Sequence, residues 1–162
     1  MIGYDVEVKG LKEQLDKLSK IDEIAGPKLR SAMLNSVQGI DNQARDNAPV
    51  GLTGEVRSGF RHKVGYYSGS GSDVWGLVEN PTFYARMLEF GTQPHWPPSG
   101  PGTKIDQWAS SHGTEAFLVA RKIARTGVKA RRFLARGFRE VRPAIDTLFA
   151  GALRQIAEAL KV

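Results

Sequence analysis

The sequence has 162 residues, of which 41% are hydrophobic and 25% are charged. This mix is typical of a globular protein with a true core, so disorder of the whole chain is excluded. Cysteine is absent, which excludes disulfides, thiolate metal sites and a cysteine nucleophile. The net charge of +6 favours nucleic acid, an anionic surface or an acidic protein as partner, without choosing among them.

The N-terminal sequence MIGYDVEVKG lacks the basic start and apolar block of a signal or transit peptide. No apolar run approaches the roughly 18 residues that a membrane-spanning helix needs. Both observations favour a soluble product of the cytoplasm with no membrane partner.

Charge is distributed unevenly along the chain. Residues 1–26 hold six acids and four bases, whereas residues 121–142 hold nine bases and one acid, Glu140. Identical copies could therefore meet head to tail through an acidic and a basic segment. The alternative is a solvated helix face that carries long cationic side chains.

The N-terminal third predicts one strand and two helices. Apolar residues alternate over residues 2–8, which predicts a half-buried strand, and then take helical spacing over residues 11–21. Gly26-Pro27 predicts the end of this helix and the start of the next. The next helix has apolar residues at steps of three and four over residues 29–44, and the sequence DNAP closes it.

The middle of the chain predicts a hairpin. Residues 50–59 contain three glycines and are expected to form a loop. Residues 60–66 and 74–79 have strand composition, and the SGSGSD sequence between them predicts a hairpin with a mobile tip. The apolar run over residues 83–90 fits either a strand or a short helix.

The C-terminal half predicts helices. Residues 93–104 contain four prolines and two glycines, which excludes a regular element. Short helices are expected over residues 105–111 and 115–125, separated by Gly113. A long closing helix has Ile145, Leu148, Ala152, Ile156 and Leu160 on one side. Pro143 lies either in its first turn or at a kink after a preceding helical stretch.

These elements predict an α+β fold. A small antiparallel sheet packs against N-terminal and C-terminal helices, and residues 1–162 form a single domain. Long flexible loops are expected near residues 68–73 and 93–104, inserted in that domain.

Signatures of catalysis are missing from the sequence. The three histidines are scattered and form no HExxH pair, so a metal site is not predicted. There is no GxSxG elbow and no GxGxxG, and Gly102-Thr103-Lys104 has the wrong order for a phosphate-binding loop. We therefore expect a protein that is not an enzyme and has no cofactor.

Residues 104–126 resemble a helix-turn-helix, and the second helix carries Arg121, Lys122 and Arg125. However, that helix begins with Thr114-Glu115, a capping sequence, where a recognition helix would place groups that contact bases. Non-specific contact with a DNA backbone is therefore favoured over sequence-specific reading.

Eight aromatic residues fall between residues 66 and 108, a number that would suit stacking on single-stranded nucleic acid. Most of them fall at strand or helix spacing, so packing in the core is the favoured interpretation. Trp96 is the exception, because it lies beside Pro97-Pro98 in the irregular segment. It suits a protein interface, although it could fold back on its own domain. The set comprises Tyr66, Tyr67, Trp75, Phe83, Tyr84, Phe90, Trp96 and Trp108.

Four blocks of the sequence resemble a known family in the same order. YARMLEFGT (84–92) resembles a block of the tail-completion proteins of long-tailed bacteriophages, which are also described as minor tail, head–tail joining or neck components. APVGLTGEVRSGF (48–60), PPSGPGTKIDQWA (97–109) and AFLVARKIARTGVKARRFLARGF (116–138) resemble further segments of that family. One departure is Arg132, where the family is expected to have a proline.

The resemblance implies a structural virion protein that completes the head-proximal end of a tail and joins it to the neck. Such proteins form a ring, usually of six copies, around a channel through which DNA passes. The implied partners are further copies of the chain, a tail-tube or tail-terminator protein, and a neck or head-completion protein. DNA contact would be non-specific, and the protein would lie in the virion after assembly in the host cytoplasm. A basic module that binds the DNA backbone is the alternative.

The resemblance also suggests roles for single residues. Tyr84, Leu88 and Phe90 are expected to pack in the core, and Gly91 to allow a turn. Glu89 would accept hydrogen bonds from nearby backbone or pair with an arginine. The motif residues with a mainly structural role are Tyr84, Ala85, Glu89, Phe90, Gly91 and Thr92.

The candidate interface residues are Trp96, Arg121, Lys122, Arg125, Lys129, Arg131 and Arg132. The basic members would meet an acidic neighbour in the ring or face the DNA channel. The first is favoured, because a strongly attractive lumen would retard the passage of DNA.

Overall fold

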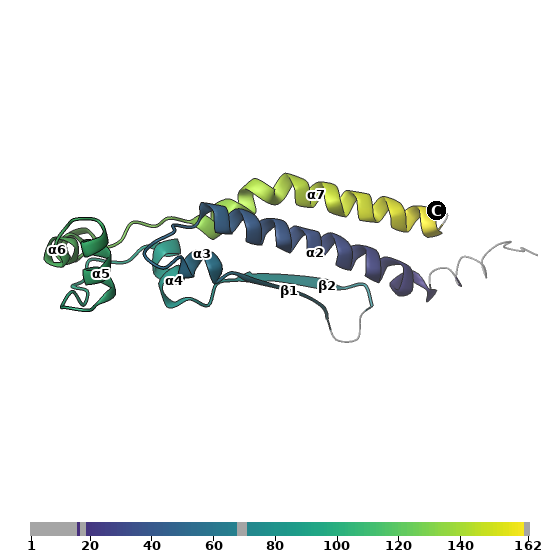
Figure 1. The fold of residues 1–162 in the computed structure, drawn as a ribbon. Coiled ribbons are helices and arrows are strands. Elements are labelled where there is room, and N and C mark those ends of the chain that lie inside the picture. Colours follow the sequence, from purple (N-terminus) through teal and green to yellow (C-terminus); the bar gives the residue numbers. More distant parts are fainter. Residues whose placement is uncertain (1–15, 17–18, 68–70, 161–162) are drawn as a thin grey trace, which may run out of the picture. The chain divides into compact units, whose positions relative to one another are not determined.

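The computed structural model describes residue 16, residues 19–67 and residues 71–160 (Figure 1). These residues form six helices and a two-stranded antiparallel sheet, which confirms the predicted α+β class. The predicted strand over residues 2–8 and most of the helix over residues 11–21 lie outside the described residues. The elements are α2 (Ile21–Asn47), α3 (Glu55–Ser58), β1 (Arg61–Tyr66), β2 (Val74–Glu79), α4 (Phe83–Phe90), α5 (Lys104–Ser111), α6 (Ala116–Thr126) and α7 (Phe133–Leu160).

Helix α2 is continuous, so the predicted boundary at Gly26-Pro27 is wrong. Pro27 lies inside the helix near its start, where the loss of one backbone N–H removes a single intrahelical hydrogen bond. Gly26 is buried, and a Cβ built on it would lie 2.2 Å from the carbonyl oxygen of Gly71. The glycine therefore serves the close approach of the hairpin to the helix, not the end of the helix.

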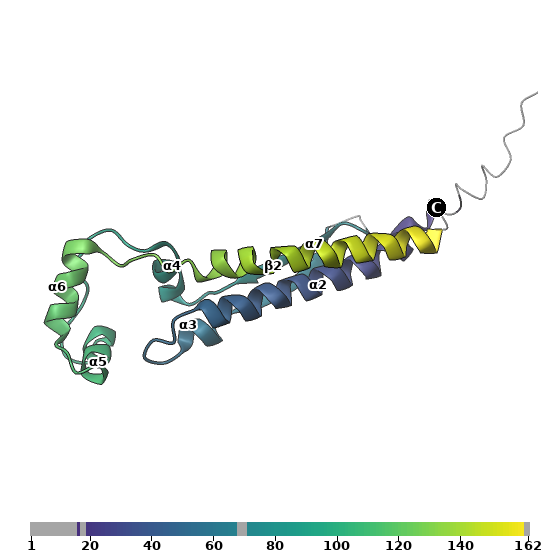
Figure 2. The same cartoon turned by 90° about the horizontal axis from the view of Figure 1, so that it is seen from above.

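The chain divides into two compact units, and the first comprises residues 1–36, 64–76 and 144–162. In this unit α2 and α7 lie side by side (Figures 1 and 2), and Ala25 packs with Ile156 and Leu160 in a small apolar cluster. The predicted apolar face of the closing helix is confirmed, since Ala152, Ile156 and Leu160 are all buried.

The second unit comprises residues 37–63 and 77–143 and contains the larger core. Phe60 and Phe133 meet there edge to face, with their ring centres 5.8 Å apart, and both are almost fully buried. Ala44, Ala48 and Ala85 surround them. Small residues permit this packing, because a Cβ on Gly137 would lie 2.8 Å from the backbone nitrogen of Ala44.

The hairpin follows the predicted strands closely. The backbone N–H of Tyr67 donates to the carbonyl oxygen of Asp73 over 2.9 Å, so Gly65 lies opposite Trp75. The ring of Trp75 covers Gly65, where a Cβ would lie 2.7 Å from the indole. Residues 68–70 of the expected mobile tip lie outside the described residues.

Two further predictions required correction or a choice between alternatives. The segment over residues 50–59 is not entirely a loop, because Glu55–Ser58 form one turn of helix with Val56 in the core. The run over residues 83–90 is a helix, α4, rather than a strand. Its Ala85 and Glu89, four residues apart, face the core, which is the spacing of a helix face.

Most of the aromatic residues expected in the core, a set that leaves out Trp96, are exposed, so that expectation is wrong. Phe90 is 75% exposed and Phe83 is 71% exposed, because they lie on the face of α4 opposite Ala85 and Glu89. Tyr84 is 38% exposed, so neither Tyr84 nor Phe90 is a core residue. Leu88 is half-buried and packs against the core cluster, as expected.

The segment predicted to be irregular over residues 93–104 contains no helix or strand over residues 93–103, and its last residue, Lys104, begins α5. This segment leads to α5 and α6, which contact each other and bury Ala109 and Ala120 almost completely. Helix α7 starts at Phe133, so Pro143 lies within a helix that begins well before it, not in the first turn. The single domain expected over residues 1–162 stays a prediction.

Candidate interaction site

The motif over residues 84–92 joins two segments that are distant in the sequence. Glu89 is buried, and its two carboxylate oxygens accept hydrogen bonds from the backbone N–H groups of Leu134 and Ala135, each over 3.0 Å. These N–H groups belong to the first turn of α7 and have no partner within the helix. Of the two roles considered for Glu89, the structure contains the backbone contact, which caps α7.

Gly91 and Thr92 extend this junction. Gly91 has φ +76°, and a Cβ there would lie 2.6 Å from the carbonyl oxygen of Val128. Thr92 donates its N–H to that carbonyl over 3.0 Å, and its hydroxyl accepts the N–H of Val128 over 3.0 Å. Both ends of residues 93–127, which carry α5 and α6, are thus held together at one place.

Arg132 occupies the residue position immediately before α7. It has φ +51°, in the left-handed region, and is the one non-glycine residue with positive φ among the described residues. Its N–H donates to the carbonyl oxygen of Glu89 over 3.2 Å, beside the 2.7 Å bond from Arg131 to Leu88. The family resemblance leads us to expect a proline here. Proline could not adopt this φ, and it has no N–H to donate in this hydrogen bond.

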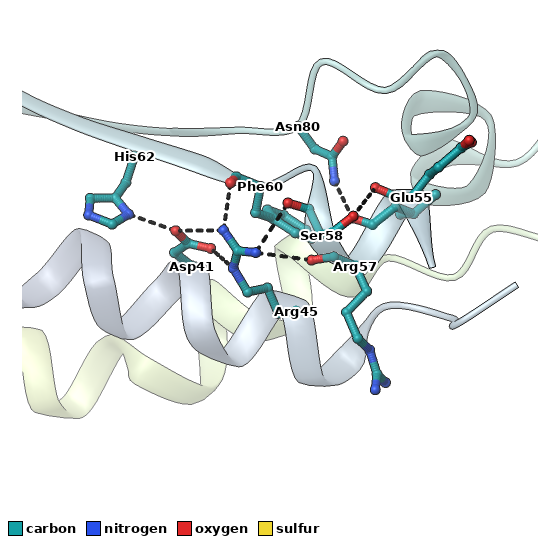
Figure 3. A network of polar contacts seen from close by, with 9 residues as sticks. Asp41, Arg45, Glu55, Arg57, Ser58, Phe60, His62 and Asn80 are labelled. Atoms are coloured by element: carbon teal, nitrogen blue, oxygen red, sulfur yellow. Dashed lines mark hydrogen bonds and ion pairs between the residues drawn. The ribbon is translucent and has the colours of Figure 1, made fainter. Parts of the chain in front are cut away.

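A second polar cluster joins α2 to the start of the hairpin (Figure 3). The guanidinium of Arg45 pairs with the carboxylate of Asp41, with 2.5 Å between Nε and Oδ1. Arg45 also donates to three carbonyl oxygens, those of Arg57, Ser58 and Phe60. His62 Nδ1 lies 2.6 Å from the other carboxylate oxygen of Asp41. The side chain of Arg45 therefore connects the segment between α2 and β1 to α2 by hydrogen bonds.

Asp41 is buried, and burial alone would raise its pKa. The hydrogen bonds and charges of Arg45 and His62 outweigh this effect and hold the pKa of Asp41 below its ordinary value of 3.8. The carboxylate is accordingly ionised near neutral pH, as its pairing with Arg45 requires.

Sequence reasoning missed this cluster, because it considered the histidines only as metal ligands. The four-residue spacing of Asp41 and Arg45 was a usable signal, since such pairs meet on one helix face. Nothing local indicated His62, which lies 21 residues from Asp41. The cluster resembles a structural joint more than a reactive site, because each of its polar groups is engaged with its neighbours.

The candidate interface residues lie on exposed parts of the second unit. Arg121, Lys122 and Arg125 lie on the outer face of α6 around Leu118, which is 50% exposed. With Thr126 they line an open depression of about 490 Å³. The remaining basic members, Lys129, Arg131 and Arg132, are exposed in the segment that leads to α7.

The structure shows one of the two roles that the sequence left open for Trp96. Its ring contacts Phe117 of α6 at 5.8 Å between ring centres, so it folds back on its own chain. It is nevertheless 57% exposed, and Phe117 is 55% exposed. The outer surface of α6 thus presents aromatic, aliphatic and cationic groups together.

None of the six basic candidates forms an ion pair within the part of the chain that the structure describes. Another base of the same stretch behaves differently, since Arg136 donates to the side chain of Asn47. In the described chain, Arg136 therefore has an internal hydrogen bond, whereas the six candidate residues form no internal ion pair.

The histidines are not brought together by the fold. His62 contacts Asp41, His95 contacts the carbonyl oxygen of Gln93, and His112 stacks on Trp108 with 4.1 Å between ring centres. Among the described residues no group of three or more potential ligands could hold a metal ion. No helix in the described part of the chain is long and apolar enough to cross a membrane.

The fold and these sites define a small α+β protein whose candidate interface residues, one aromatic and six basic, are exposed. Residues 9–91, just over half of the chain, match the model of the HK97-gp10-like family, described as "Bacteriophage HK97-gp10, putative tail-component". The chain belongs to this family of phage tail components.

The match covers α2, α3, the hairpin and α4, and it ends within the block YARMLEFGT. It includes the resembling block over residues 48–60, whereas the blocks over residues 97–109 and 116–138 lie beyond it. No curated protein and no solved structure matched the chain.

Proposed function

We propose that this protein completes the head-proximal end of a phage tail and joins it to the neck as a ring of six copies around the DNA channel. Its work is done by contacts between subunits, without catalysis, first in the host cytoplasm and then in the virion. Membership of the tail-component family supports the structural role. The observation that carries the ring is the exposed surface of α6.

This surface has the composition of a protein interface. Tryptophan and arginine are enriched in interfaces and often carry most of the binding energy. Leu118 is exposed among Arg121, Lys122 and Arg125, which have no internal ion pair in the described chain. Trp96 is exposed beside Phe117 of α6. An acidic partner would satisfy these cations while its apolar atoms cover Trp96 and Leu118.

A neighbouring copy offers acidic groups of this kind. Residues 1–26 carry six acids, and Asp22 and Glu23 are exposed in the first turn of α2. A contact between different surfaces on two copies is heterologous and generates a ring when its rotation closes. The other proposed partners are the tail-tube or tail-terminator protein on one side and the neck or head-completion protein on the other.

The experiment compares two double charge reversals in the full chain. R121E/R125E changes two exposed arginines of α6, whereas R30E/R154E makes the same change in net charge on α2 and α7. Ring formation is followed by negative-stain microscopy, and complementation is measured with phage that lack the protein. We expect R121E/R125E to lose both, and R30E/R154E to retain both.

Equal assembly and complementation by the two variants would contradict the proposed role of α6. The second candidate, a module that binds the DNA backbone, rests on the same six exposed cations. It predicts duplex binding that weakens steeply with salt and falls in R121E/R125E. No binding near physiological salt would eliminate it.

A further inference from the structure

In the part of the chain that the structure describes, the hairpin has two open edges. Strands β1 and β2 pair only with each other in the described part of the chain (Figure 1). A row of unpaired N–H and C=O groups along a strand edge is a template for pairing with another strand. A two-stranded sheet is also only marginally stable by itself, so an additional strand would stabilise it.

The register shows which backbone groups face outward. Tyr67 and Asp73 form a hydrogen-bonded pair, and such pairs alternate with non-bonded pairs along an antiparallel ladder. Gly65 and Trp75, and likewise Lys63 and Leu77, therefore bond to each other. The backbone groups of the alternate residues point away from the hairpin, those of His62 and Val64 on β1 and of Val74 and Val78 on β2.

The two edges differ in their protection. Beside the β1 edge lie two exposed cations, Arg61 and Lys63, and the indole N–H of Trp75 reaches across to the carbonyl oxygen of Tyr66 over 3.3 Å. Strand β2, with the sequence VWGLVE, has no proline and no lysine, which are common devices against edge pairing. Its Gly76 and Leu77 are exposed.

We propose that the β2 edge of one copy pairs with the β1 edge of the next copy, so that the hairpins form one continuous antiparallel sheet. This inference rests on the proposed ring and names a surface that builds it. A rotation about an axis along the strands keeps the order β1, β2, β1, β2 with alternating direction. Closure of the ring then removes every free edge.

Charge favours β1 as the occupant over a second β2. Within one hairpin Lys63 and Glu79 already form an ion pair at 3.8 Å on the face that points away from α2. Pairing β2 with a neighbouring β1 places Glu79 near Arg61 and Lys63 of that copy. Two β1 edges would place four cations side by side, which is unfavourable, and two β2 edges would form a closed dimer and leave both β1 edges free.

Cysteine cross-linking tests the pairing, because the natural chain has no cysteine. Lys63→Cys and Leu77→Cys are made in separate full-length chains, so that no bond within one chain is possible. The chains are mixed under assembly conditions and treated with a short bis-maleimide. We expect the mixed Lys63→Cys–Leu77→Cys product in several-fold excess over either product of like chains. Leu153→Cys, on the exposed face of α7, serves as the control.

A proline variant tests the same edge by a different route. Val74→Pro removes an N–H that faces outward, so the hairpin should keep its internal bonds while the ring is lost. Leu77→Pro removes an N–H that bonds to Lys63, and we expect it to disrupt the hairpin itself. Ring formation is followed by sedimentation and folding by circular dichroism, and the cross-linking result stands even if Val74→Pro does not fold.

Each other outcome would overturn the inference. Predominant products between two Leu77→Cys chains would indicate a closed β2–β2 dimer. Yields no higher than those with Leu153→Cys would show that the edges do not meet. Preferential cross-linking of Leu77→Cys to Val6→Cys would show that the strand expected over residues 2–8 fills the edge. Rings without the Lys63–Leu77 product would refute this pairing alone, whereas the absence of rings even with tail tubes would refute the proposed function.

Discussion

The carboxylate of Glu89 lies 3.0 Å from the backbone nitrogen of Leu134, 45 residues later in the chain. Together with the hydrogen bond from the N–H of Ala135, this bond makes Glu89 of α4 the cap of α7. The motif residue thus fixes where the long closing helix starts, and it does so from a different element.

Replacement of Glu89 by alanine should leave two N–H groups at the start of α7 without their partner at a part-buried place. We expect a loss of about 2–4 kcal/mol in the free energy of unfolding, measured with urea, because each orphaned group costs about 1–3 kcal/mol. Glu89→Gln should lose less, since its amide oxygen can still accept one bond. Glu158→Gln, on the exposed face of α7, is the control and should change little.

Alanine substitutions at glycines separate backbone strain from general loss of flexibility. Gly127→Ala places a Cβ 2.0 Å from the carbonyl oxygen of Thr92 at φ +68°, so we expect a loss of at least ~1–3 kcal/mol in stability. Gly100→Ala meets nothing within 4 Å and should be neutral. Similar unfolding midpoints for both variants would contradict the close backbone packing of residues 88–92 against residues 127–132.

Arg132 offers a test of the departure from the expected family pattern. Arg132→Pro should destabilise the chain by roughly 3 kcal/mol or more, because proline cannot adopt φ +51° and removes the N–H bonded to Glu89. Arg132→Gly should be neutral or slightly stabilising, since glycine adopts this φ without strain. The unfolding temperatures of both variants test this prediction. An Arg132→Pro variant as stable as the natural protein would show that the backbone at residue 132 has another conformation.

The Asp41 cluster predicts a dependence of stability on pH. Because the pKa of Asp41 is lower in the folded chain than its ordinary value of 3.8, the ionised form stabilises the fold. This contribution is complete above the unfolded pKa and is lost as the pH falls through the folded pKa. Asp41→Asn should therefore be less stable than the natural protein at pH 7, by about 2 kcal/mol, and should lose less on acidification to pH 3.

Unfolding temperatures at pH 7 and pH 3 measure this difference. Asp146→Asn, at an exposed position of α7, is the matched control and should follow the natural protein at both values. An Asp41→Asn curve parallel to that of the natural protein would show that Asp41 does not carry the predicted linkage.

Much of the secondary structure could be predicted from the sequence, because it depends on local periodicity. The strands of the hairpin, the irregular segment with four prolines and the buried face of α7 follow from spacing and composition. The predicted helix boundary at Gly26-Pro27 is wrong, because Gly26 allows the close approach of Gly71, which is remote in the sequence. The strand or helix spacing of Phe83 and Phe90 favours packing in the core, yet the buried residues of α4 are Ala85 and Glu89.

The sequence by itself determined the class of fold, the uneven charge and, through the order of its blocks, the resemblance to phage tail components. Only the tertiary structure decided that Glu89 caps α7, that Arg45 holds the entry to the hairpin, and that the cations of α6 have no internal ion pair in the described chain. The reason is physical. Helix and strand periods are properties of neighbouring residues, whereas caps, ion pairs and exposed faces depend on which distant segments meet.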